Sequence, residues 1–461
     1  MRLASAGESL ALLSAMLFCA RSAQAQDTAQ TLRADGDSFE LIARSDTYAS
    51  LFRRALLPGR AGSLVSTETA APVYEYVSLR ALRLDVGPLT DGVSIEVSAW
   101  ARGWPTAAEP ERPLDGDVQT AFTTLSAGGH FVRLGRQQAS GGAARFVRFD
   151  GVMLGSEFGA GLQAGAYTGL TVLPRWDARP GYHHLGGEAE SLLRDSEALP
   201  QPERSGHWLA GAHFGYASPA LGLSASFHEQ REQGELAHRN IGLDTRGRIG
   251  WASLHASTIV DADALRLADA RVWADLAPVD AGSLSLEYLH TEPALWLSRQ
   301  SVLSVFASNR FDEVGGTATA RLGELATLEG AGFLTVYDDG RPGVRSEASV
   351  RLLPDRRTTL RLSYVRLLAP KNGYHSLRAS LSRRLLLHTS GTFEAYQYLY
   401  DHTIADYRSS SVYAGTLSQR LAAAWSVLVG ASLARTPYAG IDAQALARVS
   451  YTFNHSSGER R

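Results

Sequence analysis

Short stretches of alternating polar and apolar residues recur from about Tyr76 to Phe453, and they constrain the fold more than any other feature of the sequence. In the last stretch, residues 447–453, an apolar or aromatic residue occupies every second position. Alternation with period two places the two sets of side chains on opposite faces of a strand. Repeated strands of this kind are typical of transmembrane antiparallel β-barrels of the outer membrane, whose apolar face meets lipid and whose polar face lines a lumen.

The N-terminus has the pattern of a cleaved signal peptide. Arg2 supplies positive charge, residues 10–20 form a short apolar run, and Ala23-Gln24-Ala25 matches a cleavage site. The apolar run is too short to span a membrane as a helix. We therefore expect residues 1–25 to be removed and the mature protein to reside in the outer membrane of a Gram-negative bacterium.

The chemistry-bearing residues give no sign of an enzyme or of a cofactor. The only cysteine, Cys19, lies in the expected signal peptide, so the mature chain lacks disulfides, thiolate metal sites and haem attachment. The sequence contains no G-x-S-x-G, P-loop or H-E-x-x-H motif. His183 and His184 lie near acidic residues, but no fixed spacing supports a metal site. No nucleic-acid partner is expected.

The chain divides into segments of different pattern. Residues 26–75 lack clear repeated alternation and are interpreted as a periplasmic lead-in or a plug inside the barrel. Residues 76–453 form the barrel, and residues 454–461 form a polar C-terminal tail. Tyr451 and Phe453 close the last strand and are the expected signal for the barrel-assembly machinery.

The number of strands is less firmly indicated than their existence. About 21 candidate strands follow Tyr76, whereas a single-chain bacterial barrel needs an even number. One strand is either missing before Tyr76 or wrongly split, and we expect about 18 strands, with 16–22 allowed. Long connections at 103–116, 171–205, 291–312 and 400–408 alternate with short turns, as expected for external loops and periplasmic turns.

Candidate lumen residues follow from the alternation. Along residues 392–400, the face opposite Phe393 carries Glu394, Tyr396 and Tyr398, with Tyr400 beyond them. Tyrosines two residues apart form a ladder of about 6–7 Å per step, on which sugar rings could stack. The alternative is that the upper tyrosines belong to the aromatic girdle at the membrane interface.

Charged residues of both signs share the expected lumen face. They include Arg345, Glu347, Arg351 and Arg378. Rings of arginine favour anionic solutes, while opposed charges create a transverse field at a constriction. The alternative is that these residues form salt bridges between strands that stiffen a wide barrel.

Two neighbouring stretches carry a resemblance to a known family. Residues 130–137 end in Leu-Gly-Arg-Gln, and residues 145–152 contain Arg-Phe-Asp-Gly. This pair of strands resembles barrels of the alginate-export type and other porin-like proteins. The resemblance implies a wide single-chain barrel that passes an exopolysaccharide, with Arg133, Arg136 and Arg148 lining a constriction.

Three functions remain open from the sequence. The first is passive export of an exopolysaccharide, together with periplasmic and inner-membrane export partners. The second is a diffusion porin for small hydrophilic solutes, in which loop 171–205 is long enough to fold inward. The third is a structural barrel that encloses a partner protein. All three imply contact with outer-membrane lipids and lipopolysaccharide, and we rank export first.

Overall fold

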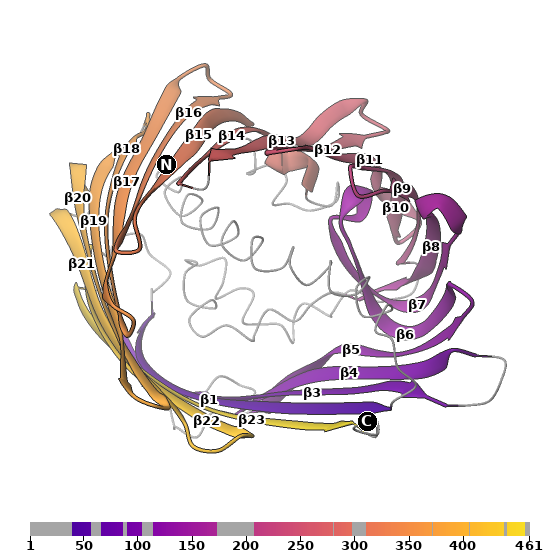
Figure 1. The fold of residues 1–461 in the computed structure, drawn as a ribbon, viewed down its shortest axis with the longest axis horizontal. Coiled ribbons are helices and arrows are strands. Elements are labelled where there is room, and N and C mark those ends of the chain that lie inside the picture. Colours follow the sequence, from indigo (N-terminus) through magenta and orange to yellow (C-terminus); the bar gives the residue numbers. More distant parts are fainter. Residues whose placement is uncertain are drawn as a thin grey trace.

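The computed structural model is a closed antiparallel β-barrel around a wide lumen (Figure 1). It describes residues 39–56, 66–85, 90–103, 114–172, 207–279, 281–296, 310–370, 372–404, 406–437 and 440–456. The expected signal peptide, residues 26–38 and 57–65 of the expected lead-in or plug, and the last five residues lie outside this range. Among the described residues, no helix has the length and apolar character needed to cross a membrane.

Each strand of the barrel pairs with its neighbours along the chain. The strands are β1 (Glu40–Leu56), β3 (Val73–Leu84), β4 (Gly92–Gly103), β5 (Leu114–Ala127), β6 (His130–Ser140), β7 (Phe146–Glu157), β8 (Leu162–Thr171), β9 (Trp208–Ala217), β10 (Leu221–Glu232), β11 (Glu235–Ile249), β12 (Ala252–Asp261), β13 (Arg266–Val279), β14 (Gly282–Thr291), β15 (Phe311–Leu322), β16 (Ala326–Tyr337), β17 (Pro342–Asp355), β18 (Thr358–Leu368), β19 (Tyr374–Leu386), β20 (Thr389–Ile404), β21 (Tyr407–Arg420), β22 (Trp425–Thr436) and β23 (Gly440–Ser456). A short strand, β2 (Ser66–Ala70), pairs with the far end of β1.

The barrel has 22 strands, because β1 pairs with β3 on one side and with β23 on the other. The expectation of about 18 strands is therefore wrong, although 22 is the upper limit of the allowed range. The strand missing from the sequence count is β1, so the wall begins well before residue 76, and residues 40–56 are neither a lead-in nor a plug. At the other end, pairing of Glu40 with Ser456 extends the wall three residues into the expected polar tail.

The two faces of each strand differ as the alternation predicts. On β20, Phe393 and Leu399 are half exposed on the outer surface, while Tyr396 and Tyr398 lie on the opposite, lumen face. Large apolar side chains with 36–85% exposure recur around the outside of the wall. Such an outward apolar belt on a closed antiparallel barrel is the architecture of an outer-membrane protein.

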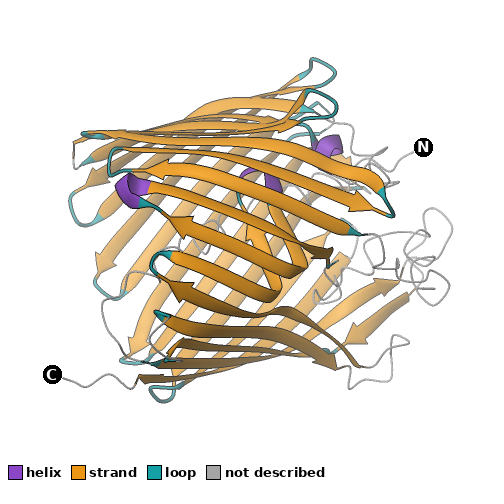
Figure 2. Cartoon of the chain, turned by 90° about the vertical axis from the view of Figure 1, so that its right-hand side faces the viewer, coloured by secondary structure: helices purple, strands orange, loops and turns teal. Residues whose placement is uncertain are grey.

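The barrel has two distinct rims. Glu40 and Ser456 meet at one rim, called the terminal rim, which carries short turns such as Gly128–Gly129. The opposite, distal rim joins the strands that flank residues 104–113, 173–206 and 297–309, which lie outside the described residues. Three of the four predicted long connections fall at the distal rim, but the prediction for 400–408 is wrong, because β20 runs to Ile404 and β21 begins at Tyr407. Figure 2 shows the strands inclined between the two rims.

The wall parts between β5 and β6. The two strands are paired from the Ala127–His130 pair at the terminal rim to the Ala121–Arg136 pair. Beyond that pair they are no longer hydrogen-bonded to each other, although both continue toward the distal rim. Gly135 at this point has φ +121°, and a Cβ there would lie 2.3 Å from the Ala121 carbonyl oxygen, so the bend requires glycine. Above the bend, β6 and β7 lean away from β5 and join through the short helix η2 (Gly142–Ala144).

Candidate transport path

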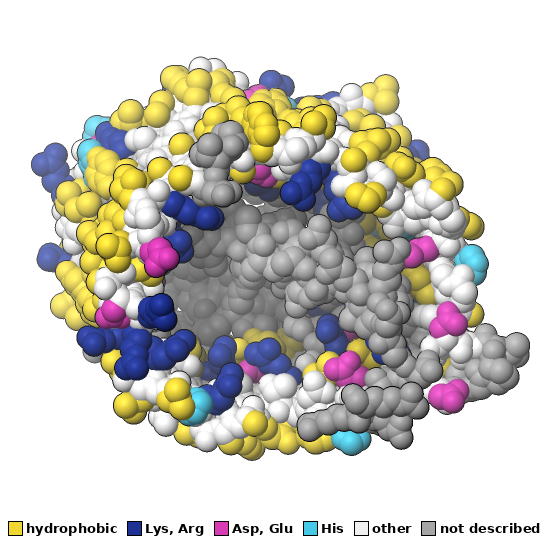
Figure 3. Space-filling view, in the orientation of Figure 1, with side chains coloured by type: hydrophobic (Ala, Val, Ile, Leu, Met, Phe, Trp, Pro, Cys, Tyr) yellow, Lys and Arg dark blue, Asp and Glu magenta, His cyan; other side chains and the backbone are white. Residues whose placement is uncertain are grey.

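A cluster of charged and aromatic side chains lines the lumen on β15 to β21. Figure 3 looks into the barrel and shows basic side chains spaced around its opening, with acidic ones between them. Arg345 lies over the ring of Phe333 at 4.1 Å, and its Nη2 approaches Glu313 Oε1 at 3.3 Å. This arginine therefore presents a guanidinium that is paired and stacked before any solute arrives.

Arg378, Glu394 and Tyr396 form one connected network on β19 and β20. Arg378 Nη2 donates to Glu394 Oε1 at 2.8 Å, and its guanidinium lies 4.7 Å from the centre of the Tyr396 ring. The Tyr396 hydroxyl donates to the other carboxylate oxygen of Glu394 at 3.0 Å. Arg378 and Tyr396 face each other in the strand register, so the pleat itself sets this arrangement.

The tyrosine ladder extends from this network toward the distal rim. Tyr398 packs edge-on against Tyr374 with ring centres 5.6 Å apart. The Tyr400 hydroxyl lies 2.7 Å from Ser410 Oγ, which is buried. Tyr396, Tyr398 and Tyr400 lie on the face of β20 opposite Leu399. They therefore face the lumen and do not belong to an outer aromatic girdle.

The remaining charges of this wall are of both signs. Arg351 stands opposite Arg361 in the register, and Arg361 Nη2 lies 3.8 Å from Glu329 Oε1. Glu347 occupies the same lumen face, two residues from Arg345. Carboxylates thus lie among the arginines of this wall, while Arg351 and Arg361 place two positive charges side by side.

A second polar cluster closes the barrel at β1, β3 and β23, and the sequence interpretation missed it. Asp46 accepts hydrogen bonds from Arg44 Nε at 2.6 Å and from Ser450 Oγ at 2.5 Å. Tyr48 packs edge-on against Tyr76 at 5.4 Å. The alternation in residues 40–49 is the sequence signal for this cluster. It was not interpreted as a wall strand, because residues 26–75 were expected to form a lead-in or plug.

The parted ends of β6 and β7, residues 137–149 with η2, form an arm that folds inward past β8 and β9 and reaches β10 and β11. Ala143 N donates to Ser226 Oγ at 2.8 Å, and Asn240 Nδ2 approaches the Ala143 carbonyl oxygen at 3.4 Å. Ser226 and Asn240 belong to the lumen face of β10 and β11. The arm is thus an inward-folded element of the kind expected of a diffusion porin, and it comes from residues 137–149. Loop 171–205, which was expected to be long enough to fold inward, lies outside the described residues from 173 onward.

An apolar cluster packs the arm against β9. Ala139, Val147, Phe149 and Leu209 form the buried hydrophobic cluster, with Phe149 and Leu209 fully buried. At the end of the arm, burial lowers the pKa of Arg145 to about 10, an effect that the charge of Asp269 on β13 partly offsets. The side chain remains cationic at neutral pH.

Arg136 and Arg148 hold the wall together where β5 and β6 part. Arg136 forms a bidentate pair with Asp150 at 2.7 and 3.0 Å, and Arg148 Nη1 binds Asp117 Oδ2 at 2.8 Å. Arg136 Nη1 also approaches Asp117 at 3.4 Å. These two arginines, expected to line a constriction, therefore have carboxylate partners at the base of the arm.

Arg133 lies lower on the same strand and faces the lumen. Its Nε donates to Thr124 Oγ1 at 3.1 Å, and its guanidinium lies 4.4 Å from the ring centre of Phe122 and 5.7 Å from that of Phe131. Of the three arginines carried over from the resemblance, Arg133 alone takes this position on the lumen wall.

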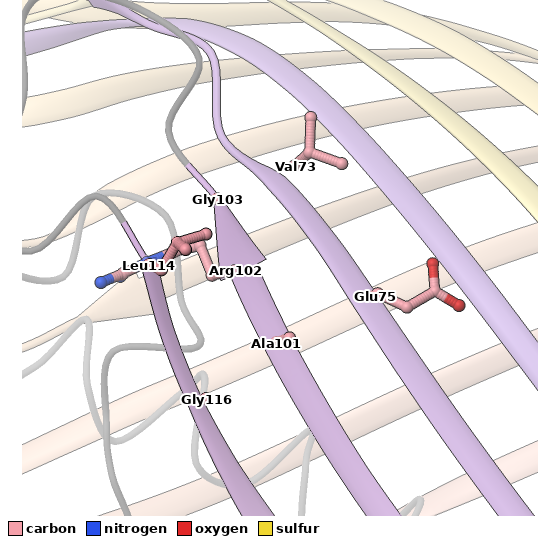
Figure 4. Close-up of a pocket in the computed structure, with 7 residues that line it drawn as sticks. All are labelled: Val73, Glu75, Ala101, Arg102, Gly103, Leu114 and Gly116. Atoms are coloured by element: carbon pink, nitrogen blue, oxygen red, sulfur yellow. The ribbon is translucent and has the colours of Figure 1, made fainter.

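A groove on the outer face of β3 to β5 has an unexpected acidic residue. Val73, Ala101, Gly103 and Gly116 contribute to its lining, with the Glu75 carboxylate beside them (Figure 4). Glu75 accepts hydrogen bonds from Ser45 and Thr47, each at 2.5 Å. These hydroxyls satisfy both carboxylate oxygens on a face that otherwise carries apolar side chains.

Among the described residues, no group of three or more histidine, cysteine or acidic side chains is placed to hold a metal ion. The lumen therefore offers polar walls, paired charges and aromatic faces, which are the groups that contact a solute in passage.

Comparison with known proteins supports the barrel and leaves its substrate open. No family model matches the chain, and no curated protein matches its sequence. OccAB4 of Acinetobacter baumannii is similar in structure, with 8% identity and a TM-score of 0.42, covering 90% of this chain and 98% of that one. The siderophore receptor PirA of Pseudomonas aeruginosa has 10% identity and a TM-score of 0.51, covering 89% and 80%. The likeness to PirA is one of fold, and these similarities do not reproduce the resemblance to alginate-export barrels.

Proposed function

We propose that the protein is a passive outer-membrane channel for small hydrophilic solutes. The observation that carries this proposal is the combination of a polar lumen face with an arm that folds inward and docks on β10 and β11. A barrel of this size is too wide for its wall side chains to fill, so an inward element sets the limiting width. This was the second of the functions considered from the sequence.

The paired charges support weak selectivity. Arg345, Arg361 and Arg378 each have a carboxylate within 4.0 Å, so each presents little net charge to a passing ion. Opposed charges still produce a field across the passage, which orients polar solutes. We expect a slight preference for anions, because Arg351 stands opposite Arg361 and brings two positive charges together on the lumen wall.

Exopolysaccharide export remains a second candidate on one observation, the tyrosine ladder. Tyr374, Tyr396 and Tyr398 present aromatic rings along the lumen wall, and aromatic rings stack on sugar faces. A polymer could slide by exchanging equivalent contacts, driven by its synthesis and by a periplasmic export partner. Enclosure of a partner protein is the third candidate.

Single-channel conductance in planar bilayers separates these functions. Steady conductance that oligosaccharides leave unchanged supports the diffusion channel. Stepwise block by oligosaccharides, lost in Tyr396→Ala/Tyr398→Ala, supports export and contradicts the first proposal. The matched control is Tyr364→Ala/Tyr413→Ala, which removes two tyrosines that are 39% and 47% exposed on the outer face. Absence of conductance supports a partner-filled barrel and contradicts both channel proposals.

A further inference from the structure

The outer wall of β10 and β11 carries a cationic cluster near the distal rim. Arg231 Nε donates to Glu229 Oε1 at 2.8 Å, and Arg239 Nε donates to Glu229 Oε2 at 2.9 Å. Two guanidinium groups therefore share one carboxylate, which leaves one net positive charge. Glu229 and Arg239 are cross-strand neighbours, so the register of β10 and β11 builds the cluster.

The cluster lies where the apolar belt ends. Below it on the same outer face are Phe227 and Ile241, which are 40% and 45% exposed. Trp208 on β9 is 38% exposed and pairs with Arg231 in the register, and the guanidinium lies 5.9 Å from a ring of this tryptophan. An outward tryptophan above an apolar belt marks the level of the lipid head groups.

The arginines retain free donors at this level. In each, Nε is the atom that binds Glu229, and Arg231 Nη1 also approaches the Gly234 carbonyl oxygen at 3.4 Å. Within the described part of the chain, the terminal nitrogens of Arg239 have no hydrogen-bond partner. The side chains of Arg231 and Arg239 are 36% and 35% exposed, so these donors can be reached from outside the wall.

We propose that Arg231 and Arg239 bind the phosphate monoester of a membrane lipid at the outer wall of the barrel. The fork of N–H donors on arginine matches phosphate geometry, and a phosphate monoester carries more than one negative charge. Glu229 neutralises one of the two guanidinium groups and competes with the phosphate for them, while Trp208 and Phe227 contact the acyl part of the same lipid. The acidic residues at the hairpin tip are separate from this face. Glu232 accepts a hydrogen bond from Gln230 on the lumen side, and Glu235 stands opposite Glu232 in the register.

The test uses the full-length protein in phosphatidylcholine nanodiscs that contain a small fraction of phosphatidic acid. Native mass spectrometry counts the phosphatidic acid that stays bound. Arg231→Gln/Arg239→Gln should lower this binding about tenfold, since two charge-assisted contacts are lost. Glu229→Gln should raise it, because the competing carboxylate is removed. The control is Arg341→Gln, because Arg341 lies at the same rim, pairs one-to-one with Asp339 at 2.8 Å and should have no effect.

The outcomes decide the proposal. Wild-type binding by a double variant that still shows the heat-dependent gel shift of a folded barrel would overturn it. Equal displacement of the lipid by inorganic phosphate would also overturn it, because the site would then select a soluble anion. If the double variant does not fold, Arg239→Gln alone keeps the Arg231–Glu229 pair and should lower binding about threefold.

Discussion

The docking of the arm on β10 and β11 can be tested by adding one methyl group under it. Gly242 lies on the lumen face of β11, and a Cβ there would sit 2.5 Å from Ala143 N and 2.9 Å from Gly142 C. Both atoms are backbone, so the overlap cannot be relieved by turning a side chain, and Gly242→Ala must displace the arm. Overpacking of this kind costs about 2 kcal/mol. We therefore expect about 30-fold more frequent undocking.

Undocking can be measured by cysteine labelling, because the mature chain contains no cysteine once the expected signal peptide is removed. Ala139 on the arm is 6% exposed and belongs to the buried apolar cluster, so a maleimide should reach Ala139→Cys only after the arm lifts. Adding Gly242→Ala should raise the labelling rate about 30-fold.

The matched control is Gly332→Ala, which adds a methyl group where no heavy atom lies within 4 Å. It should leave the labelling rate unchanged. Equal labelling rates with and without Gly242→Ala, in barrels that remain folded, would refute the idea that this contact holds the arm.

Three further predictions concern the wall, the arm and the lumen. Asp46→Ala should lower the free energy of unfolding by about 1–3 kcal/mol, because Arg44 and Ser450 lose a buried acceptor where β1 meets β23. The temperature at which the folded barrel unfolds on a gel should fall, and an unchanged temperature would contradict this role. Phe149→Ala should cost about 3–5 kcal/mol by leaving a cavity in the apolar cluster, measured as the urea midpoint, with the half-exposed Phe393→Ala as the control that changes little. Glu394→Gln should leave Arg378 without its carboxylate and shift the reversal potential in a salt gradient toward anions; a shift toward cations would show that Arg378 does not face the conducting path.

The sequence predicted the faces of the strands because that information is local. Alternation along residues 392–400 is sufficient to separate Phe393 from Tyr396 and Tyr398, and the register of β19 and β20 then brings Arg378 to Tyr396. The missing strand, β1, was harder to recognise, since residues 48–57 contain an amphipathic pattern that fits a helix as well as a strand.

The arm could not be predicted from local pattern. Its docking depends on Ser226 and Asn240, which lie 83 and 97 residues from Ala143 in the sequence. The sequence could not indicate Asp117 as the partner of Arg148. A β-bulge in the pairing of β4 and β5 shifts the register next to Asp117, and this shift is not visible in the local pattern. The glycines at 135, 141 and 142 are the one local signal, because they permit the bend and the short turn.

The seam between β1 and β23 has a consequence for how the chain can be built. Asp46 and Ser450 are hydrogen-bonded although 404 residues separate them, so the ring cannot close until the last strand has been synthesised. Because Glu40 and Ser456 are paired neighbours, a short linker could join the two ends and new ends could be opened in a turn of the same rim. A barrel permuted in this way would begin and finish between a different pair of strands, and would reveal whether its insertion into the membrane depends on which strand is made last.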